Sequence, residues 1–412
     1  MKKLTHILAA ILMLTLLVSI LAGCSNSQTT DVNAASDAKT NSESGSSSSD
    51  DVIKIGYIDN LTGDSSAYGI LCQMGVNLAH ELNDTVLGKK IEVITVDNKS
   101  DKVESANAAS RLIEQEKVVA ILAPTSSGLS MAIGEIIKEA KIPTMASAAT
   151  NPLVTQDNPY FWRICFTNDF KAEAMAQFAF EQGWKKVALM TEITNESAVN
   201  SVSTFKNALQ ELTGDADCCP VEVSYSSSDT DFSAQLGVLA QYEFNAIYCP
   251  GNYSYVPLIV GQAMTFGQDY QWLGTDSWDV GEFITLGGDN VVNRCYFPTF
   301  FDASGAKLTD VTTTLLEEFA KKYGPDETVA PNVALGFDAY NVLVKAIEIA
   351  GSNGSLDGDS ICKALKEMKD VPCATGYITF NDEHNVENLC VIKTVGEDKT
   401  FTYVTTVYPS VK

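Results

Sequence analysis

Short apolar runs alternate with amphipathic segments from Val52 onward, and this alternation restricts the possible folds more than any other feature. The apolar runs predict strands at 52–58, 91–96, 118–122 and 142–146. The segments with an apolar residue every three or four positions predict helices at 68–82, 104–115 and 129–140. Because strands that alternate with helices form parallel sheets covered on both faces, the sequence predicts an α/β lobe of the doubly wound type.

The same rhythm restarts after Asn168. It predicts helices at 172–182, 198–212, 232–242 and 256–265, and strands at 186–190, 221–225, 246–249 and 271–273. About 360 residues also exceed what one core usually organises, so we expect a second doubly wound parallel-sheet lobe.

The last third contains too few elements for a third domain. It predicts helices at 315–322, 333–350 and 361–368, followed by strands at 377–380, 389–394 and 401–404. We therefore expect the chain to return to the first lobe and then to the second, through a hinge that it crosses several times. The predicted boundaries are 52–167 with 299–386 for lobe 1, and 168–298 with 387–412 for lobe 2.

The N-terminus predicts export and lipidation. Lys2 and Lys3 precede an apolar stretch that is too short and wrongly flanked for a stable membrane span, and it ends in Leu21-Ala22-Gly23-Cys24. We interpret residues 1–23 as a lipoprotein signal peptide and Cys24 as the lipidated residue, which places the protein at the outer face of the cell membrane. The alternative is an ordinary signal peptide with an accidental cysteine.

Residues 24–51 predict a flexible tether. They are mainly Ser, Asn, Thr, Asp and Ala, and such a stretch cannot bury enough apolar surface to offset its ordering entropy.

Charge and composition exclude several classes of function. Without the signal peptide the chain has 26 basic and 52 acidic residues, a balance of −26 that argues against nucleic acid as a partner. Only His80 and His384 remain, and two histidines argue against a metal site built from imidazole ligands and against a Ser-His-Asp catalytic triad. Nine cysteines other than Cys24 have irregular spacing, and most, including Cys72, Cys165, Cys249 and Cys390, lie in apolar runs as buried small hydrophobes.

Two loops of the first lobe follow predicted strands and are candidate ligand contacts, because ligands of parallel sheets lie beyond the carboxyl ends of the strands. Pro124-Thr125-Ser126-Ser127-Gly128 opens a helix, so its amides and hydroxyls suit a carboxylate, with simple helix capping as the alternative. Ser147-Ala148-Ala149-Thr150-Asn151-Pro152 lets a ligand approach the backbone, with an ordinary turn before Pro152 as the alternative.

A third loop, Gly274-Thr275-Asp276-Ser277-Trp278-Asp279, follows a strand of the second lobe. One of its carboxylates suits an ammonium group and the other suits capping of the next helix, although each aspartate alone is more often a cap. Anion donors in one lobe and an acid in the other have the polarity needed to bind a zwitterion between lobes.

With these loops in view, the chain resembles the leucine/isoleucine/valine-binding family of ABC-transporter solute receptors, which are type I periplasmic solute-binding proteins. The likeness covers Val52 to about Val404. It is carried by Ile55-Gly56, Leu61-Thr62-Gly63, Ala67-Tyr68-Gly69, Thr125-Ser126-Ser127-Gly128, Ala148-Ala149-Thr150-Asn151-Pro152, Arg163, Asp231-Phe232-Ser233, Gly274-x-Asp276-x-Trp278-Asp279, Leu335-Gly336-Phe337-Asp338-Ala339 and Thr375-Gly376-x-Ile378-x-Phe380.

The resemblance implies roles for matching residues. Ser127 and Thr150 would bind the α-carboxylate of an amino acid through hydroxyl and backbone N–H groups. The Ala148 carbonyl and the Asp276 carboxylate would take the α-ammonium, with Thr150 bridging, and Tyr68 would form part of the side-chain wall.

Three departures from the family pattern predict a polar side-chain pocket. Where relatives carry aromatic residues, this chain has Glu196 in place of a Tyr-Gly tyrosine, Asn252 after Pro250-Gly251, and Asn332.

We therefore expect a monomeric binding protein that closes on an amino acid or similar small zwitterion and presents it to ABC permease subunits. The rival hypothesis is a ligand-sensing subunit of a membrane signalling receptor. An enzyme is the least favoured hypothesis, because no nucleophile–base pair or cofactor motif is present. We expect no catalytic residue, no cofactor and no metal ion.

Overall fold

The computed structural model describes residues 52–63, 65–303, 309–386 and 390–407. These residues belong to one compact unit, Ser48–Lys412. The predicted signal peptide, Cys24 and the predicted tether lie outside the described residues, as does the side chain of Glu196.

The first sheet has the strand order β2-β3-β1-β4-β5-β6. Its strands are β1 (Val52–Asp59), β2 (Thr85–Val86), β3 (Lys89–Asp97), β4 (Ala120–Ala123), β5 (Thr144–Ala146) and β6 (Phe161–Arg163). All neighbours run parallel except β2, which pairs antiparallel with β3 at one edge. The accompanying helices are α2 (Ser66–Leu82), α3 (Lys102–Arg111), the π-helix η2 (Leu112–Glu116), α4 (Ser127–Ala140) and the 3₁₀ helix η3 (Pro152–Val154).

The second sheet has the order β15-β14-β11-β10-β9-β7-β8. Its strands are β7 (Val187–Glu192), β8 (Glu222–Tyr225), β9 (Ala246–Tyr248), β10 (Gln271–Leu273), β11 (Cys295–Thr299), β14 (Cys390–Val395) and β15 (Phe401–Val407). The strands from β8 to β11 are parallel, whereas β14 pairs antiparallel with β11, and β15 pairs antiparallel with β14. The helices are α5 (Asn168–Glu181), α6 (Glu196–Thr213), α7 (Ser233–Leu239), α8 (Val256–Thr265) and α9 (Gly281–Gly287), with the 3₁₀ helices η4 (Asp276–Trp278) and η5 (Gly288–Val291).

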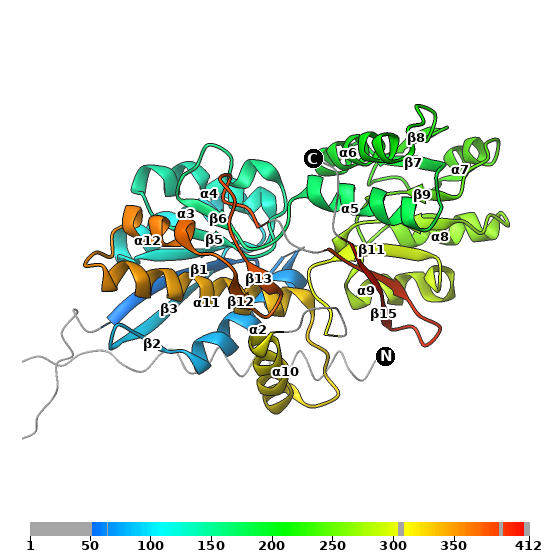
Figure 1. Ribbon diagram of the computed structural model, residues 1–412. Helices are drawn as coiled ribbons and strands as arrows, with labels where there is room; N and C mark the ends of the chain where they lie inside the picture. The colour runs from blue at the N-terminus through cyan, green and yellow to red at the C-terminus, as the bar shows by residue number, and fades with distance from the viewer. Residues whose placement is uncertain (1–51, 64, 304–308, 387–389, 408–412) are drawn as a thin grey trace, which may run out of the picture. The chain divides into compact units, whose positions relative to one another are not determined.

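The last third of the chain returns first to the first lobe and then to the second. It forms α10 (Asp310–Tyr323), α11 (Pro331–Ser352), α12 (Gly358–Glu367) and a small sheet of β12 (Val371–Cys373) with β13 (Gly376–Ile378). Helix α11 packs against α2, and α12 packs against α11. Figure 1 shows α11 in gold and α12 in orange beside the first sheet. The chain thus passes between the lobes after β6, after β11 and before β14.

The predicted fold class is confirmed: an α/β protein with two lobes, each built on a sheet with a parallel core. The antiparallel edge strands were not part of the prediction. They form because β2 and β3 are joined by a tight turn, and because β15 follows β14 as a hairpin. The residue boundaries of the two lobes stay a prediction.

Two glycines allow the contact between α2 and α11. A Cβ atom on Gly75 of α2 would lie 1.9 Å from the Val333 carbonyl oxygen, and one on Gly336 of α11 would lie 2.3 Å from the Cys72 carbonyl oxygen. The two helix backbones therefore approach closely only because neither residue has a side chain.

The cysteines behave as the sequence predicts. All nine cysteines of the described residues are free thiols, and all except the partly exposed Cys219 are buried. The predicted burial of Cys72, Cys165, Cys249 and Cys390 is confirmed.

In the part of the chain that the structure describes, no helix combines the length and the apolar character needed to cross a membrane.

Candidate functional site

The loop after β4 is held in place by a buried carboxylate at the end of β1. Asp59 is fully buried, and its Oδ1 accepts hydrogen bonds from the backbone N–H and the hydroxyl of Thr125, each 3.0 Å long. The hydroxyl of Tyr57 donates to Oδ2 at 2.8 Å. Burial raises the pKa of Asp59, while these hydrogen bonds act to lower it. The loop that leads to Ser126 is therefore fixed to the neighbouring strand.

The loop after β5 is held by a buried arginine at the end of β6. Arg163 donates to the Ala149 carbonyl at 2.8 Å, to the Pro152 carbonyl at 3.2 Å and to the Thr155 hydroxyl at 3.0 Å. Burial lowers the pKa of this guanidinium. The arginine thus shapes the segment that contains Ala148 and Thr150, and it lines neither of the two cavities described below.

The serine hydroxyls at the N-terminus of α4 do not cap this helix. Ser126 occupies the N-cap position, yet its side chain makes no capping hydrogen bond. The Ser127 hydroxyl accepts a bond of 3.2 Å from the Asn151 backbone N–H, which links the first two loops. The structure thus does not show the capping alternative for this loop, and the helix terminus keeps the polarity that suits an anion.

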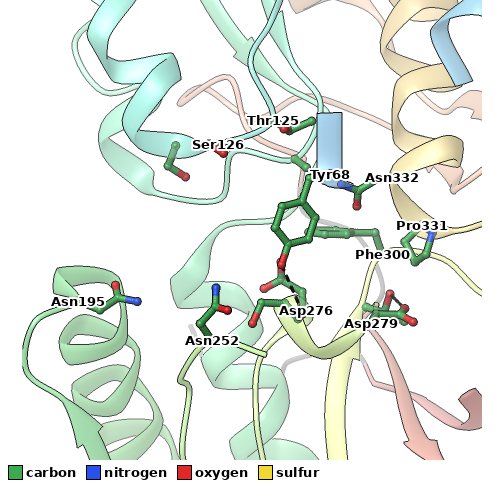
Figure 2. A pocket seen from close by; sticks show the side chains of 14 residues that line it. Tyr68, Thr125, Ser126, Asn195, Asn252, Asp276, Asp279, Phe300, Pro331 and Asn332 are labelled. Carbon is green, nitrogen blue, oxygen red and sulfur yellow. Dashed lines mark hydrogen bonds between the residues drawn. The ribbon is translucent and has the colours of Figure 1, made fainter. Parts of the chain in front are cut away.

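A first cavity of about 390 Å³ joins these loops to the carboxyl ends of the second sheet. In Figure 2, Tyr68 of α2 lies at its centre, with Thr125 and Ser126 on one side and Asn195, Asn252 and Asp276 on the other. Phe300, which follows β11, and Asn332, at the start of α11, lie to the right of Tyr68 in this view. The full lining is Tyr68, Thr125, Ser126, Ser127, Ala148, Asn195, Asn252, Asp276, Ser277, Asp279, Thr299, Phe300, Pro331 and Asn332.

A second cavity of about 160 Å³ shares Asn195, Asn252, Asp276 and Ser277 with the first. Its other lining residues are Thr150, Asn168, Lys171, Ser197, Ala198, Ser201, Pro250, Gly251 and Thr275. The Thr150 hydroxyl donates to Asn168 Oδ1 at 2.8 Å, and the Asn168 amide donates to the Ser197 hydroxyl. This second space is therefore a polar continuation of the first.

Tyr68 connects the two lobes directly. Its hydroxyl donates to the Ser277 carbonyl over 3.5 Å, and its ring contacts Tyr253 edge to face with centroids 6.1 Å apart. Burial, with the nearby Asp276 carboxylate, raises the pKa of the Tyr68 phenol far above its ordinary value, so the hydroxyl stays protonated at neutral pH. The side chain can offer a ligand an aromatic wall.

Both aspartates of the third loop are already paired within the protein. Lys171 of α5 donates from Nζ to Asp276 Oδ1, and the two side chains are only 6% and 19% exposed. Lys393 of β14 lies 3.2 Å from Asp279 and 3.3 Å from Asp302.

The prediction that one of these aspartates caps the next helix is wrong. Helix α9 has no side-chain cap. Asp279 instead accepts a hydrogen bond of 2.5 Å from the Thr299 hydroxyl, at the end of β11. It pairs with groups from β11 and β14 because these strands bring a hydroxyl and a cation to the same loop.

The structure brings most of the predicted ligand-binding residues together. Tyr68, Ser127, Ala148, Asn252, Asp276 and Asn332 line the first cavity, and Thr150 lines the second. Glu196 begins α6 beside Asn195, but its side chain lies outside the described part. The individual binding roles of these residues stay predictions.

Several lining residues were missed by the sequence analysis. Phe300 was missed because β11 was not predicted. Lys171 had a readable signal: it is a cation in the first turn of a helix, where the helix dipole disfavours positive charge. The positions three and four residues away on the same helix face, 167, 168, 174 and 175, carry no acid, so the sequence leaves room for an acidic partner from elsewhere in the fold.

Comparison with known proteins agrees with this geometry. Residues 52–398 match the periplasmic binding protein family. The Leu/Ile/Val-binding protein BraC3 of Rhizobium johnstonii is 24% identical over 339 residues, which cover 80% of this chain and 88% of that protein. The leucine-binding protein LivK of Thermotoga maritima is 35% identical, with a TM-score of 0.78 over 87% of this chain and 99% of the other.

Two more distant relatives show how widely the fold is used. The solute-binding protein of an ABC transporter from Rhodopseudomonas palustris, solved with 3,4-dihydroxybenzoic acid, has a TM-score of 0.74 at 22% identity over 88% of this chain and 98% of the other. Glutamate receptor 2.3 of Arabidopsis thaliana is 23% identical over 313 residues, 73% of this chain and 34% of the receptor.

The family match covers most of the chain, and the relatives that span the full fold are solute-binding proteins. The resemblance to the leucine/isoleucine/valine-binding family is confirmed. The chain belongs to the periplasmic binding protein family.

Proposed function

We propose that this chain is an extracytoplasmic solute-binding lipoprotein of an ABC importer. It takes a small carboxylate-bearing solute, an amino acid or a related compound, in the first cavity and delivers it to permease subunits. It acts as a monomer, without catalysis or a cofactor, and a lipid on Cys24 holds it at the outer face of the membrane.

The observation that carries this proposal is the composition of the first cavity. Loops at the carboxyl ends of both sheets contribute to it, and they include the serine-rich start of α4 on one side and Asn252 with Asp276 on the other. Free hydroxyl and N–H groups at a helix start suit a carboxylate. A ligand that contacts both lobes stabilises their closed arrangement.

The side chain of the solute is proposed to be polar. The amides of Asn252 and Asn332 line the first cavity, and Asn252 Oδ1 accepts a bond of 3.0 Å from the Ser254 N–H. An aliphatic group placed against their remaining donors and acceptors would desolvate these without a partner, at about 1–3 kcal/mol each. The ligands in the names of the two leucine-binding relatives therefore do not transfer directly to this chain.

A thermal-shift screen tests the proposal. The purified protein is heated with each of the twenty amino acids and with a panel of small carboxylic acids. A true ligand at 100 times its Kd stabilises the folded state by about 2.7 kcal/mol. We expect polar members to raise the melting temperature more than leucine, isoleucine or valine.

The control variants are Asn332→Ala, which should reduce the shift, and Gly237→Ala, which is remote from the cavity and should retain it. Strong stabilisation by leucine or valine alone would contradict the polar pocket. No stabilisation by any small carboxylate would contradict the solute-binding proposal itself.

A sensing role is the second candidate, because the chain also aligns with a plant glutamate receptor. Deletion of the gene separates the two functions. An importer subunit is required for uptake of the radiolabelled solute, whereas a sensor is required for the cellular response and leaves uptake unchanged.

A further inference from the structure

The carboxylate of Asp276 is neutralised from inside the protein. Lys171 donates to Asp276 Oδ1, and the Thr275 hydroxyl donates to the same oxygen at 2.8 Å. Within the described part of the chain, Oδ2 has no hydrogen-bond partner. The acid at the position where a ligand ammonium was expected therefore already has a cation.

The neighbouring acid of the same loop pairs with a different cation. Asp279, the other acid lining the first cavity, is 3.2 Å from Lys393, which it shares with Asp302 at 3.3 Å. Burial raises the pKa of the nearby Cys165 thiol to about 12, so this thiol stays neutral at physiological pH. Asp276 and Lys171 together thus present a pair with no net charge.

A ligand cannot readily displace Lys171 from this pair. Its side chain is 6% exposed, and the residue lies in the first turn of α5, whose dipole also disfavours a cation. A buried ammonium that lost its carboxylate partner would be strongly destabilised. Lys171 therefore stays in place while a ligand enters.

We propose that Lys171 is a specificity-determining residue that makes the site prefer carboxylates without an α-ammonium group to the matching amino acids. This inference rests on the proposed function, in which the cavity binds a small carboxylate-bearing solute. An ammonium at Asp276 Oδ2 would share one negative charge with Lys171. Repulsion from Lys171 offsets its attraction to Asp276, while the ammonium still loses its water.

A ligand without the ammonium avoids this conflict. It leaves the pair of Asp276 and Lys171 intact, and its carboxylate still reaches the hydroxyl and N–H groups at the start of α4. The lysine supplies from within the protein the cation that an amino acid would otherwise bring.

Isothermal titration calorimetry with matched probes tests this inference. The probe pairs differ only in the α-amino group: glutamine and 4-carbamoylbutanoate, glutamate and glutarate, leucine and 4-methylpentanoate, and phenylalanine and 3-phenylpropanoate. The wild-type protein is expected to bind the acid without the amino group at least as tightly as its amino acid.

Two variants separate charge from packing. Lys171→Met keeps the length of the side chain but leaves Asp276 as an unpaired anion, so the ratio of the two dissociation constants should shift at least tenfold towards the amino acid. Lys171→Arg retains the cation and should keep the wild-type preference. Circular dichroism of each variant checks that it is folded.

The inference is overturned if the wild-type protein binds an amino acid more tightly than its partner acid, or if Lys171→Met leaves the ratio unchanged. Should Lys171→Met fail to fold, the wild-type ratio alone decides. Binding of none of the probes to any of the proteins overturns the proposed function as well, which distinguishes the two failures.

Discussion

At the scale of single residues, two buried carboxylates hold loops in place rather than binding a ligand. Asp59 fixes the loop after β4, and Asp338 of α11 fixes the turn between β12 and β13. Asp338 is fully buried and accepts bonds of 2.7 Å from the Ala374 N–H, 2.8 Å from the Thr375 N–H and 2.8 Å from the Thr375 hydroxyl. Each acid satisfies backbone donors that would otherwise be buried without partners.

Asp338 should make stability depend on pH. Burial raises its pKa from the ordinary 3.8 to about 6, although the three hydrogen bonds act in the opposite direction. Between these values the native state binds more protons than the unfolded state, so the stabilisation from this group is full below pH 3.8 and is lost as the pH rises through 6. The full effect is roughly 3 kcal/mol.

Asp338→Asn removes this titration. In urea unfolding between pH 4 and pH 7.5, the difference in stability between wild type and variant should fall as the pH rises. Asp97→Asn is the control: hydrogen bonds lower the pKa of Asp97 below 3.8 despite some burial, so its contribution is already complete above pH 4 and its difference should stay nearly constant in this range. A constant difference for Asp338→Asn would contradict the assignment.

At the element scale, the crossing of α2 and α11 positions two walls of the first cavity. Helix α2 carries Tyr68, and α11 begins with Pro331 and Asn332. Because Gly75 and Gly336 let the helix backbones touch, the separation of these walls depends on two residues without side chains.

Gly75→Ala and Gly336→Ala should each destabilise the protein by about 1–3 kcal/mol, because the added methyl group meets backbone atoms that cannot rotate away. Gly237→Ala in α7 is the matched control. No atom lies within 4 Å of a Cβ at Gly237, so this change should stabilise by about 0.5–1 kcal/mol. Chemical unfolding of the three variants checks the contrast, and equal effects would contradict the packing argument.

At the scale of the whole molecule, the proposed function requires an anchor as well as a cavity. The anchor prediction concerns Cys24, which lies outside the described residues. Two lipid chains at about 0.8 kcal/mol per buried methylene would hold the protein stably at a membrane, where a single chain would not.

Cys24→Ser should therefore release the protein from the membrane without changing its fold. Fractionation of cells that express wild type or variant, followed by detergent-free washing, measures the outcome. Cys219→Ser, a change to the partly exposed thiol, should leave the protein in the membrane fraction. A Cys24→Ser protein that stays membrane-bound would contradict the lipoprotein assignment.

The amino-acid sequence by itself determined the fold class and the loops that form the cavity. Alternating apolar patterns are local, and the order of strands and helices places Ser127, Ala148 and Asp276 at strand ends. The sequence did not reveal β6 or β11. Strand β11 contains Pro298, and a proline within a run argues against a strand. Strand β6 has only three residues and ends in the charged Arg163.

The charge state of the site was decided only by the tertiary structure. Lys171 and Asp276 are separated by 105 residues, and Lys393 and Asp279 by 114. An ion pair depends on which side chains the packed lobes bring within a few ångströms and away from water, and no local pattern records that distance. Asp276, which the sequence predicted as the partner of a ligand ammonium, is thus paired with Lys171 of the protein itself.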